Sequence, residues 1–303
     1  MNYLNLIRYQ NLLFIALVQV FIKYGLFPPF GIDTTLNTFS FSLLVLATLC
    51  IAAAGNIIND IYDVEIDRIN KPEKLLIGKK ISENTANRLF VILNILGVGI
   101  GFYLANNIGK PSFAALFIVI SALLYLYASY LKGILLVGNL VISALVAMSL
   151  IIVGLFDLLP AITAENQATQ SAVFSIILDY AFFAFFINFI REIVKDLQDI
   201  NGDKNGGLNT LPIALGRKRT VIIVFGLGII AVAAVVFYMY QNLYRHQYAL
   251  LYCLFLIVAP LLYFCLKSFS AEKPNDFAHL STVLKVCMFL GMCSILLIPF
   301  AIL

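Results

Sequence analysis

Long apolar segments recur along the whole of this 303-residue chain. A helix rises about 1.5 Å per residue, so about 20 consecutive and mostly apolar residues are needed to cross a bilayer. By that measure the sequence predicts nine transmembrane helices, at approximately 11–30, 39–62, 86–106, 112–131, 134–156, 173–194, 219–240, 247–267 and 282–302. Turn-forming and polar residues predict loops at 27–38 and 157–172. We therefore expect an all-α fold, a polytopic membrane bundle.

The composition agrees with a membrane protein and argues against several other classes. Charged residues make up only 12% of the chain, compared with about 25% in soluble domains. The first apolar run is preceded by no basic region and followed by no small-residue cleavage site, so we expect it to be a span and not a signal peptide. The five cysteines all lie in apolar stretches, and no Cys-x-x-Cys pair occurs, which favours neither a zinc site nor a disulfide framework.

The positions of the basic residues predict the orientation. Short cytoplasmic loops carry an excess of Lys and Arg. With the N-terminus inside, the inner side has Arg8, Arg68, Lys71, Lys74, Lys79, Lys80, Arg88, Lys132, Arg191, Lys195, Lys204, Arg217, Lys218, Arg219, Lys267, Lys273 and Lys285, and the outer side has Lys23, Lys110 and Arg245. We expect a bacterial or archaeal cell membrane, with the N-terminus cytoplasmic and the C-terminus outside. Basic residues that flank spans and form no separate patch do not indicate nucleic-acid binding.

Two acidic segments share one spacing. "NDIYDVEID" (59–67) and "DLQDINGD" (196–203) both contain the pattern D-x-x-D-x-x-x-D. They follow the predicted second and sixth spans, four spans apart, which suggests an internal duplication. We therefore expect a single domain over 1–303, made of two pseudo-repeated halves at about 1–131 and 132–303.

Each acidic segment is predicted to place its aspartates on one side of a helix. At about 100° per residue, the three aspartates of each pattern fall within a narrow arc. Asn56 and Asn59 lie on the same side of the first helix, whereas Glu65 points away. Asn188 and Glu192 lie near the second arc. Two such stripes facing each other would be too negative to persist without cations.

The ligand chemistry of these segments favours magnesium and a diphosphate. Mg²⁺ is usually bound by one or two carboxylates together with phosphate oxygens of a substrate. Basic residues lie beside both segments: Arg68, Lys71 and Lys74 beside the first, and Arg191, Lys195 and Lys204 beside the second. Metal and basic side chains together can stabilise the charge on a departing diphosphate. The alternative is that these are solvated loops whose charges only maintain topology, but two clusters of identical spacing at membrane level favour a functional site.

The sequence resembles the UbiA superfamily of intramembrane prenyltransferases. The resemblance rests on "GNIINDIYDVEIDRINKP" (55–72), "REIVKDLQDINGDKNGGLNTLPIALG" (191–216) and "YASYLKGILLVGN" (127–139), and with the nine spans it covers essentially the whole chain. It implies a nine-helix bundle with a central cavity that opens sideways to lipid. In such enzymes a polyprenyl diphosphate binds through Mg²⁺ and ionises, and its allylic carbocation alkylates an acceptor.

The resemblance also implies roles for individual residues. Asn59, Asp63 and Asp67 would bind a first magnesium, with Asp60 adjacent, and Asp199 and Asp203 would bind a second, with Asp196 in support. Asp63, Asp67, Asp199 and Asp203 are thereby the expected catalytic residues. The candidates for substrate contacts are Asn56, Asn59, Arg68, Lys71, Lys132, Asn139, Arg191 and Lys195.

The acceptor is predicted from the second acidic segment. Residues 191–216 are most similar to members that transfer a geranylgeranyl group to geranylgeranylglycerol phosphate in ether-lipid synthesis. In many relatives an Arg-Pro…Pro-Ser-Gly run follows the first motif, whereas this chain has "KPEKLLIGKKIS" (71–82). Relatives that prenylate 4-hydroxybenzoate or 1,4-dihydroxy-2-naphthoate for quinone synthesis share both motifs, so an aromatic acceptor is the alternative.

Two other functional classes fit less well. A cation-coupled secondary transporter usually has its charges near the bilayer midplane, whereas here they follow the ends of spans. The D-G-x-x-A-R opening of CDP-alcohol phosphotransferases is absent from the sequence. The expected partners are therefore a polyprenyl diphosphate, a lipid or aromatic acceptor and membrane lipids, with no nucleic acid and no obligatory protein partner.

Overall fold

A computed structural model describes residues 1–73 and 75–302 of the chain. Within these ranges, nine helical segments are long and apolar enough to cross a membrane: Tyr9–Phe30, Thr38–Tyr62, Glu83–Asn107, Pro111–Ser129, Val137–Ala161, Gln167–Asn205, Arg217–Leu243, Gln247–Ser268 and Pro274–Phe300. They confirm the predicted all-α membrane bundle and its number of spans. The protein is a multi-pass integral membrane protein.

The α-helices follow one another with short connections. In chain order they are α1 (Asn2–Leu6), α2 (Tyr9–Val20), α3 (Thr38–Tyr62), α4 (Val64–Asn70), α5 (Glu83–Asn107), α6 (Ala114–Ser129), α7 (Val137–Val153), α8 (Gln167–Asn205), α9 (Leu211–Leu215), α10 (Arg217–Tyr238), α11 (Gln247–Cys253), α12 (Ala259–Ser268), α13 (Pro274–Ser294) and α14 (Ile298–Ile302). Wider π-helical turns extend or join several of them, at Phe21–Leu26, Gly154–Leu158, Met239–Leu243 and Leu254–Val258.

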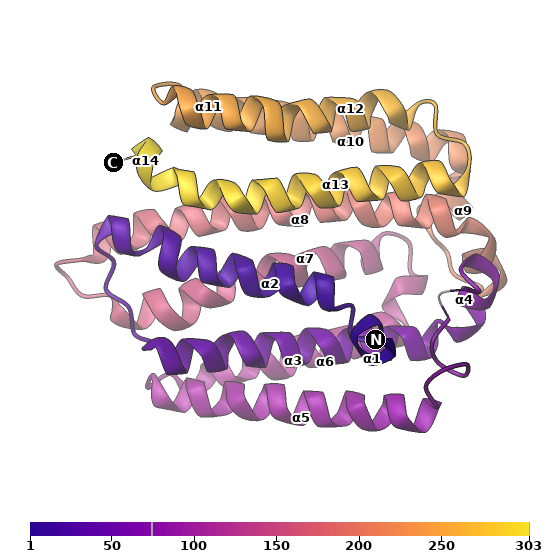
Figure 1. The fold of residues 1–303 in the computed structure, drawn as a ribbon, viewed down its shortest axis with the longest axis horizontal. Helices are drawn as coiled ribbons and strands as arrows, with labels where there is room; N and C mark the ends of the chain where they lie inside the picture. Colours follow the sequence, from indigo (N-terminus) through magenta and orange to yellow (C-terminus); the bar gives the residue numbers. More distant parts are fainter. Residues whose placement is uncertain (74, 303) are drawn as a thin grey trace.

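The spans lie side by side, with α8 in the interior of the bundle (Figure 1). This helix packs along α7 on one side and along α13 on another, while α3 packs along α5. Small residues allow α5 to approach its neighbours α3 and α6 closely, as is common where helices pack within membranes. A Cβ atom at Gly101 of α5, for example, would lie 2.3 Å from the ring of Phe117 on α6.

Three short helices, α1, α4 and α9, lie toward one end of the bundle (Figure 1). The N-terminus lies toward that end, and the C-terminus lies at the opposite one (Figure 1). Both acidic segments are also found at the end with the N-terminus: the first runs from the end of α3 into α4, and the second is the last part of α8. We call this the acidic end and the other the far end.

Three boundaries differ from the sequence-based expectation. The predicted loop at 157–172 is largely helical, since a π-turn and a 3₁₀ turn extend α7 to Ala161 and α8 begins at Gln167. The sixth span, predicted to end at 194, continues to Asn205. The ninth begins at Pro274 instead of 282, with Asp276 accepting hydrogen bonds from the backbone of Glu272 and Lys273. Hydropathy locates the apolar centre of a helix, whereas polar end residues can continue it into water.

An ion pair lies inside the far end of the bundle. Lys23 Nζ is 2.7 Å from Asp157 Oδ2, and both side chains are buried. The ammonium also donates to the carbonyl oxygen of Leu36 at 2.7 Å, and Asp157 Oδ1 accepts from the Leu36 backbone N–H at 2.8 Å. The sequence analysis counts Lys23 among the basic residues of the outer side, and the structure adds that its side chain is buried. The pair joins the end of the first span, the 31–37 connection and the end of the fifth span.

This pair gives a testable prediction for stability. Lys23→Met leaves the buried carboxylate of Asp157 without its counter-charge, which costs about 3–5 kcal/mol in comparable buried pairs. We expect a clearly lower thermal unfolding midpoint in detergent. The double variant Lys23→Met/Asp157→Asn removes the charge but keeps an oxygen for the Leu36 N–H, so it should recover much of the loss. A double variant no more stable than Lys23→Met would contradict an electrostatic cause.

Candidate active site

The first acidic segment changes direction at Asp63. Helix α3 ends at Tyr62, Asp63 has φ −90° and ψ 1°, and α4 begins at Val64. The predicted continuous helical stripe is therefore interrupted there. Helical backbone hydrogen bonds nevertheless continue across this bend: the Asp63 N–H donates to the Asn59 carbonyl, and the Asp67 N–H donates to the Asp63 carbonyl. Glu65 is exposed and points away, as expected from the sequence.

The second acidic segment is the last part of α8. Asp196, Asp199 and Asp203 lie on one uninterrupted helix, so the predicted common face is retained in this half. Asp203 is buried, with 7% of its surface exposed. Helix α4 packs against α8, which brings the two segments together at the acidic end.

Asn70 fastens α4 to α8. Its amide Nδ2 donates to the Asp199 carbonyl at 2.9 Å, and its Oδ1 accepts from the Gly202 N–H at 2.8 Å. Glycine is needed at position 202, because a Cβ atom there would lie 2.3 Å from Asn70 Nδ2. Beside this contact, Lys71 Nζ pairs with Asp199 Oδ2 at 2.6 Å. A side chain from the first segment thus neutralises a carboxylate of the second.

Asp63 is neutralised by a residue from the middle of the chain. Lys132 lies in the 3₁₀ turn Leu131–Gly133 between α6 and α7, and its ammonium pairs with Asp63 Oδ1. Asn59 Nδ2 donates to the other oxygen of Asp63 at 2.7 Å. Gly138 on α7 permits the close turn, since a Cβ atom there would lie 2.6 Å from the Lys132 Cα.

Arg8 is a member of the cluster that sequence reasoning missed as a site residue. Its Nη2 lies 2.6 Å from Asp60 Oδ1, and its backbone has φ 52° and ψ 55°, a conformation uncommon for residues other than glycine. Within the part of the chain that the structure describes, Asn56 hydrogen-bonds to none of the acidic groups; its amide donates to the Ile7 carbonyl at 2.9 Å and so helps to hold the N-terminal segment. An isolated arginine before the first span has no motif that would have identified it.

Other candidate residues lie on α8 before its last acidic turns, or contact it there. Asn139 of α7, a predicted substrate contact, donates to Asp196 Oδ2 at 2.9 Å. Glu192 is buried between two cations, with Lys195 Nζ at 2.7 Å and Arg191 Nη1 at 3.3 Å.

The basic residues directly after the first acidic segment contribute less to the cluster. Arg68 lies outside the cluster, because it is exposed and pairs with Glu65 at 2.9 Å. Lys74, expected beside the first segment, lies outside the described residues.

The assembled carboxylates repel one another. Burial, together with the nearby charges of Asp63 and Asp60, raises the pKa of Asp67 to about 6, while Lys71 opposes the shift. Asp203 lies within electrostatic range of Asp199 and Asp63. Such a group of acidic side chains is stabilised by added positive charge.

The donor set fits Mg²⁺ completed by a substrate. Among the described residues, no group of three His, Cys, Asp or Glu side chains is arranged to hold a metal by itself. Mg²⁺ commonly uses only one or two carboxylates and takes its other ligands from phosphate and water. The ammonium groups of Lys71 and Lys132 already occupy cationic positions on Asp199 and Asp63. Asn59, Asp63 and Asp67 could bind one metal ion, and Asp199 and Asp203 another.

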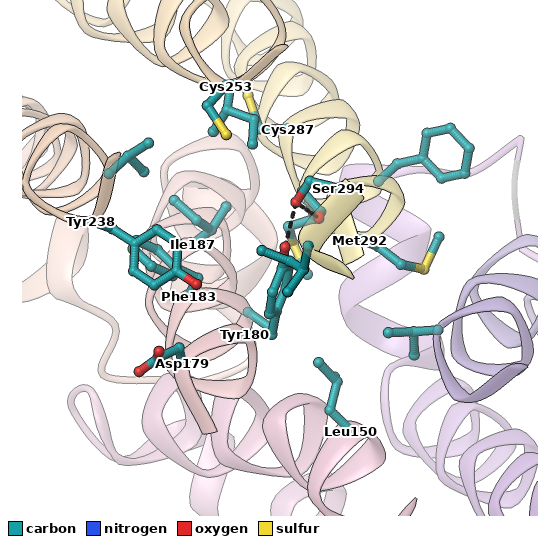
Figure 2. A pocket seen from close by; sticks show the side chains of 18 of the residues that line it. Leu150, Asp179, Tyr180, Phe183, Ile187, Tyr238, Cys253, Cys287, Met292 and Ser294 are labelled. Atoms are coloured by element: carbon teal, nitrogen blue, oxygen red, sulfur yellow. Dashed lines mark hydrogen bonds between the residues drawn. The ribbon is translucent and has the colours of Figure 1, made fainter. Parts of the chain in front are cut away.

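An apolar chamber lies farther along the bundle, toward the far end. It lies between α2, α7, α8, α13 and residues of the segment 235–261. Figure 2 shows Ile187, Phe183 and Tyr180 of α8 along it, with Cys287 and Met292 of α13 opposite. The Tyr180 hydroxyl and Ser294 Oγ are 2.7 Å apart within its wall (Figure 2). A long hydrocarbon chain is the kind of ligand that such a lining favours.

The Asn70–Gly202 contact gives a prediction for the joining of the two segments. Gly202→Ala should displace the Asn70 amide and remove two hydrogen bonds, each worth about 1 kcal/mol. We expect faster hydrogen exchange over 64–70 and a lower thermal midpoint. Gly99→Ala on α5 is the control, because no atom lies within 4 Å of the added Cβ. Equal exchange over 64–70 in both variants would show that this contact does not hold α4.

Comparison with known proteins extends these observations. Residues 12–293 match the model of the UbiA prenyltransferase family. A digeranylgeranylglyceryl phosphate synthase of Korarchaeum cryptofilum (strain OPF8) is 33% identical over 268 residues, which cover 86% of each chain. A second, from Sulfolobus acidocaldarius, is 37% identical over 222 residues, covering 73% of this chain and 72% of the relative.

The fold is also that of solved members. A structure from work on digeranylgeranylglyceryl phosphate synthase in membranes has a TM-score of 0.65 and 25% identity, covering 98% of this chain and 97% of the other. The UbiA homologue from Archaeoglobus fulgidus bound to DMAPP and Mg²⁺ has a TM-score of 0.60 and 18% identity, with 97% and 99% covered. Because the family model spans nearly the entire chain and the relatives align over most of their own lengths, this protein belongs to the UbiA family and is a prenyltransferase.

Proposed function

We propose that the protein transfers a geranylgeranyl group from its diphosphate to geranylgeranylglycerol phosphate, in a reaction that depends on Mg²⁺. The observation that carries the proposal is the meeting of two aspartate-rich segments with Arg8, Lys71 and Lys132 at one end of a membrane bundle. The relatives named digeranylgeranylglyceryl phosphate synthase support the acceptor. The homologue bound to Mg²⁺ and DMAPP supports the metal and the donor class.

The proposed roles follow from the contacts. Asn59, Asp63 and Asp67 would bind one Mg²⁺, and Asp199 and Asp203 a second. When bound, the metal supplies positive charge that stabilises the departing diphosphate. Asp60 and Asp196 are better placed as supporting groups, since Arg8 and Asn139 already engage them.

The proposed substrate contacts divide by position. Lys71 and Lys132 lie on the carboxylates that would receive metal, so they can turn from these oxygens to those of a diphosphate. Asn59, Asn139, Arg191 and Lys195 lie at or near the cluster, whereas Asn56 and Arg68 would act less directly.

The chemistry requires charge stabilisation on one side and protection from water on the other. The bond between donor C1 and the diphosphate oxygen breaks, and its electron pair leaves with the diphosphate. The acceptor hydroxyl oxygen bonds to C1 and loses its proton to a carboxylate of the cluster or to the diphosphate. Lysines and arginine at the acidic end stabilise the leaving group, while the apolar interior of the bundle limits the access of water to the allylic cation.

The organisation of the chain and its place in the cell are part of the same proposal. The two acidic segments and their equal spacing support one domain built from two related halves. The bend at Asp63 distinguishes the first half from the straight α8 of the second. The acidic end would face the cytoplasm of a prokaryotic cell, where Mg²⁺ and a diphosphate are accessible, and the basic residues concentrated near it support this orientation.

Replacement of single carboxylates tests the metal assignment. Asp63→Asn and Asp199→Asn should each reduce kcat at least a hundredfold, because each removes a charged metal ligand, while the protein remains folded. Glu65→Gln is the matched control, since Glu65 lies in the same segment but is exposed and forms an ion pair with Arg68. Prenyl transfer at saturating Mg²⁺ is the measurement. Near wild-type turnover in either aspartate variant would contradict the assignment for that segment.

The acceptor is tested by direct competition. Geranylgeranylglycerol phosphate, 4-hydroxybenzoate and 1,4-dihydroxy-2-naphthoate are supplied at equal concentration with geranylgeranyl diphosphate in one detergent. We expect the glycerol phosphate to be prenylated, because a hydroxyl needs only a proton acceptor, whereas a ring carbon needs an arene held face-on to the cation. Product from an aromatic acid, with none from the glycerol phosphate, would overturn the acceptor but not the prenyltransferase activity.

A further inference from the structure

Two basic side chains lie on the neighbouring helices α8 and α13, nearer the middle of their spans than the acidic segments. Lys285 is in the middle of α13 and Arg191 is on the long α8, two helices that pack along one another. Arg191 lies within electrostatic range of Lys285. Two cations side by side within a membrane span are costly unless an anion joins them.

Neither side chain has its full set of partners within the described residues. Lys285 forms no ion pair there, and its ammonium lies 5.1 Å from the centre of the Phe14 ring on α2. Arg191 Nε is buried and has no hydrogen-bond partner, although Nη1 reaches Glu192 at 3.3 Å. A buried donor without an acceptor is rare and points to a group that completes it.

The charges suit a phosphate monoester. Arg191, Lys195 and Lys285 are three cations, and among residues 1–73 and 75–302 the carboxylate that pairs with any of them is that of Glu192. The set therefore has a net charge of +2. A phosphate monoester carries about −1.5 to −2 at neutral pH and accepts several hydrogen bonds.

The apolar chamber begins directly beyond these cations. On α8, Arg191 lies one turn from Ile187, which lines the chamber with Ala184 and Tyr180 on the same helical stripe. On α13, Lys285 lies one turn from Met288 and Phe289, which also line it. A ligand with its anionic head at the cations would therefore extend a hydrocarbon chain toward the far end.

We propose that Arg191 and Lys285, with Lys195, bind the phosphate of the acceptor lipid, and that the chamber holds the acceptor's isoprenoid chain. This inference rests on the proposed function and adds the location and the recognition of the acceptor. Eight residues separate Arg191 from Asp199, about 12 Å along the helix. That interval accommodates the glycerol unit, with its free hydroxyl directed toward donor C1 at the acidic end. Arg191 and Lys195, expected from the sequence near the donor diphosphate, are thereby reassigned to the acceptor.

Kinetics separate the two anion sites. Lys285→Met and Arg191→Met should raise the KM for geranylgeranylglycerol phosphate at least tenfold and change the KM for geranylgeranyl diphosphate less than twofold. Lys285→Arg keeps the charge and should restore the acceptor KM to within about threefold of wild type. Lys218→Met removes an exposed basic residue at the acidic end and should change neither constant. An equal rise in both KM values would place the donor diphosphate at these cations and overturn the inference.

Binding without turnover tests the site independently of the reaction. Thermal shifts are measured without Mg²⁺ and donor, using geranylgeranylglycerol phosphate, geranylgeranylglycerol, inorganic phosphate and a two-chain phosphatidic acid. We expect the first to raise the midpoint of the wild type most, and Lys285→Met to reduce its effect to that of the uncharged lipid. Equal stabilisation by phosphatidic acid would indicate a site for bulk lipid headgroups, and an unchanged shift in Lys285→Met would also overturn the inference.

The prenylation assay and the thermal-shift measurement together distinguish a failure of this inference from a failure of the proposed function. If the wild type fails to prenylate geranylgeranylglycerol phosphate, the proposed function is wrong. A phosphate-dependent shift that Lys285→Met abolishes would still support an anion site at these cations. If prenylation occurs but neither the acceptor KM nor the shift responds to Lys285→Met, the acceptor assignment is wrong while the proposed function stands.

Discussion

Mutual repulsion among carboxylates is the constraint on which the acidic end depends. Two segments of the chain bring six aspartates to one end of the bundle, and each segment by itself is already rich in negative charge. Lys71, Lys132 and Arg8 reach three of these carboxylates from different parts of the chain. The fold therefore places cations where the charge of a metal or the contacts of a diphosphate would be needed. The ion pairs that stabilise this end of the bundle are therefore also the contacts that a bound metal and diphosphate would replace.

Helix α8 connects this end to the interior of the bundle. Its last turns contain the second acidic segment, its middle contains Glu192 between Arg191 and Lys195, and its earlier turns line the apolar chamber. A single rigid element can thus hold three chemically different regions in fixed register. This arrangement suits two amphiphilic substrates whose charged heads must meet while their hydrocarbon chains remain in an apolar environment.

The sequence was sufficient for the spans, the family and the acidic segments, because hydropathy and fixed spacing are local signals. It was insufficient where contacts join distant residues. Nothing near Arg8 or Asp60 in the sequence indicates that they pair, and hydropathy could not show that Lys23 is buried against Asp157. The bend at Asp63 also escaped prediction, since the residues around it are compatible with one continuous helix.

The central claim, that both acidic segments bind metal around one diphosphate, is tested most directly by locating the metal. With crystals grown with Mn²⁺ and a non-reactive thiolodiphosphate analogue of the donor, anomalous data collected just above and just below the manganese absorption edge would distinguish the metal ions from sulfur. We expect two peaks, one beside Asp63 and Asp67 and one beside Asp199 and Asp203, with diphosphate oxygens between them. An analogue bound at the acidic end with no metal peak at either segment would contradict the claim.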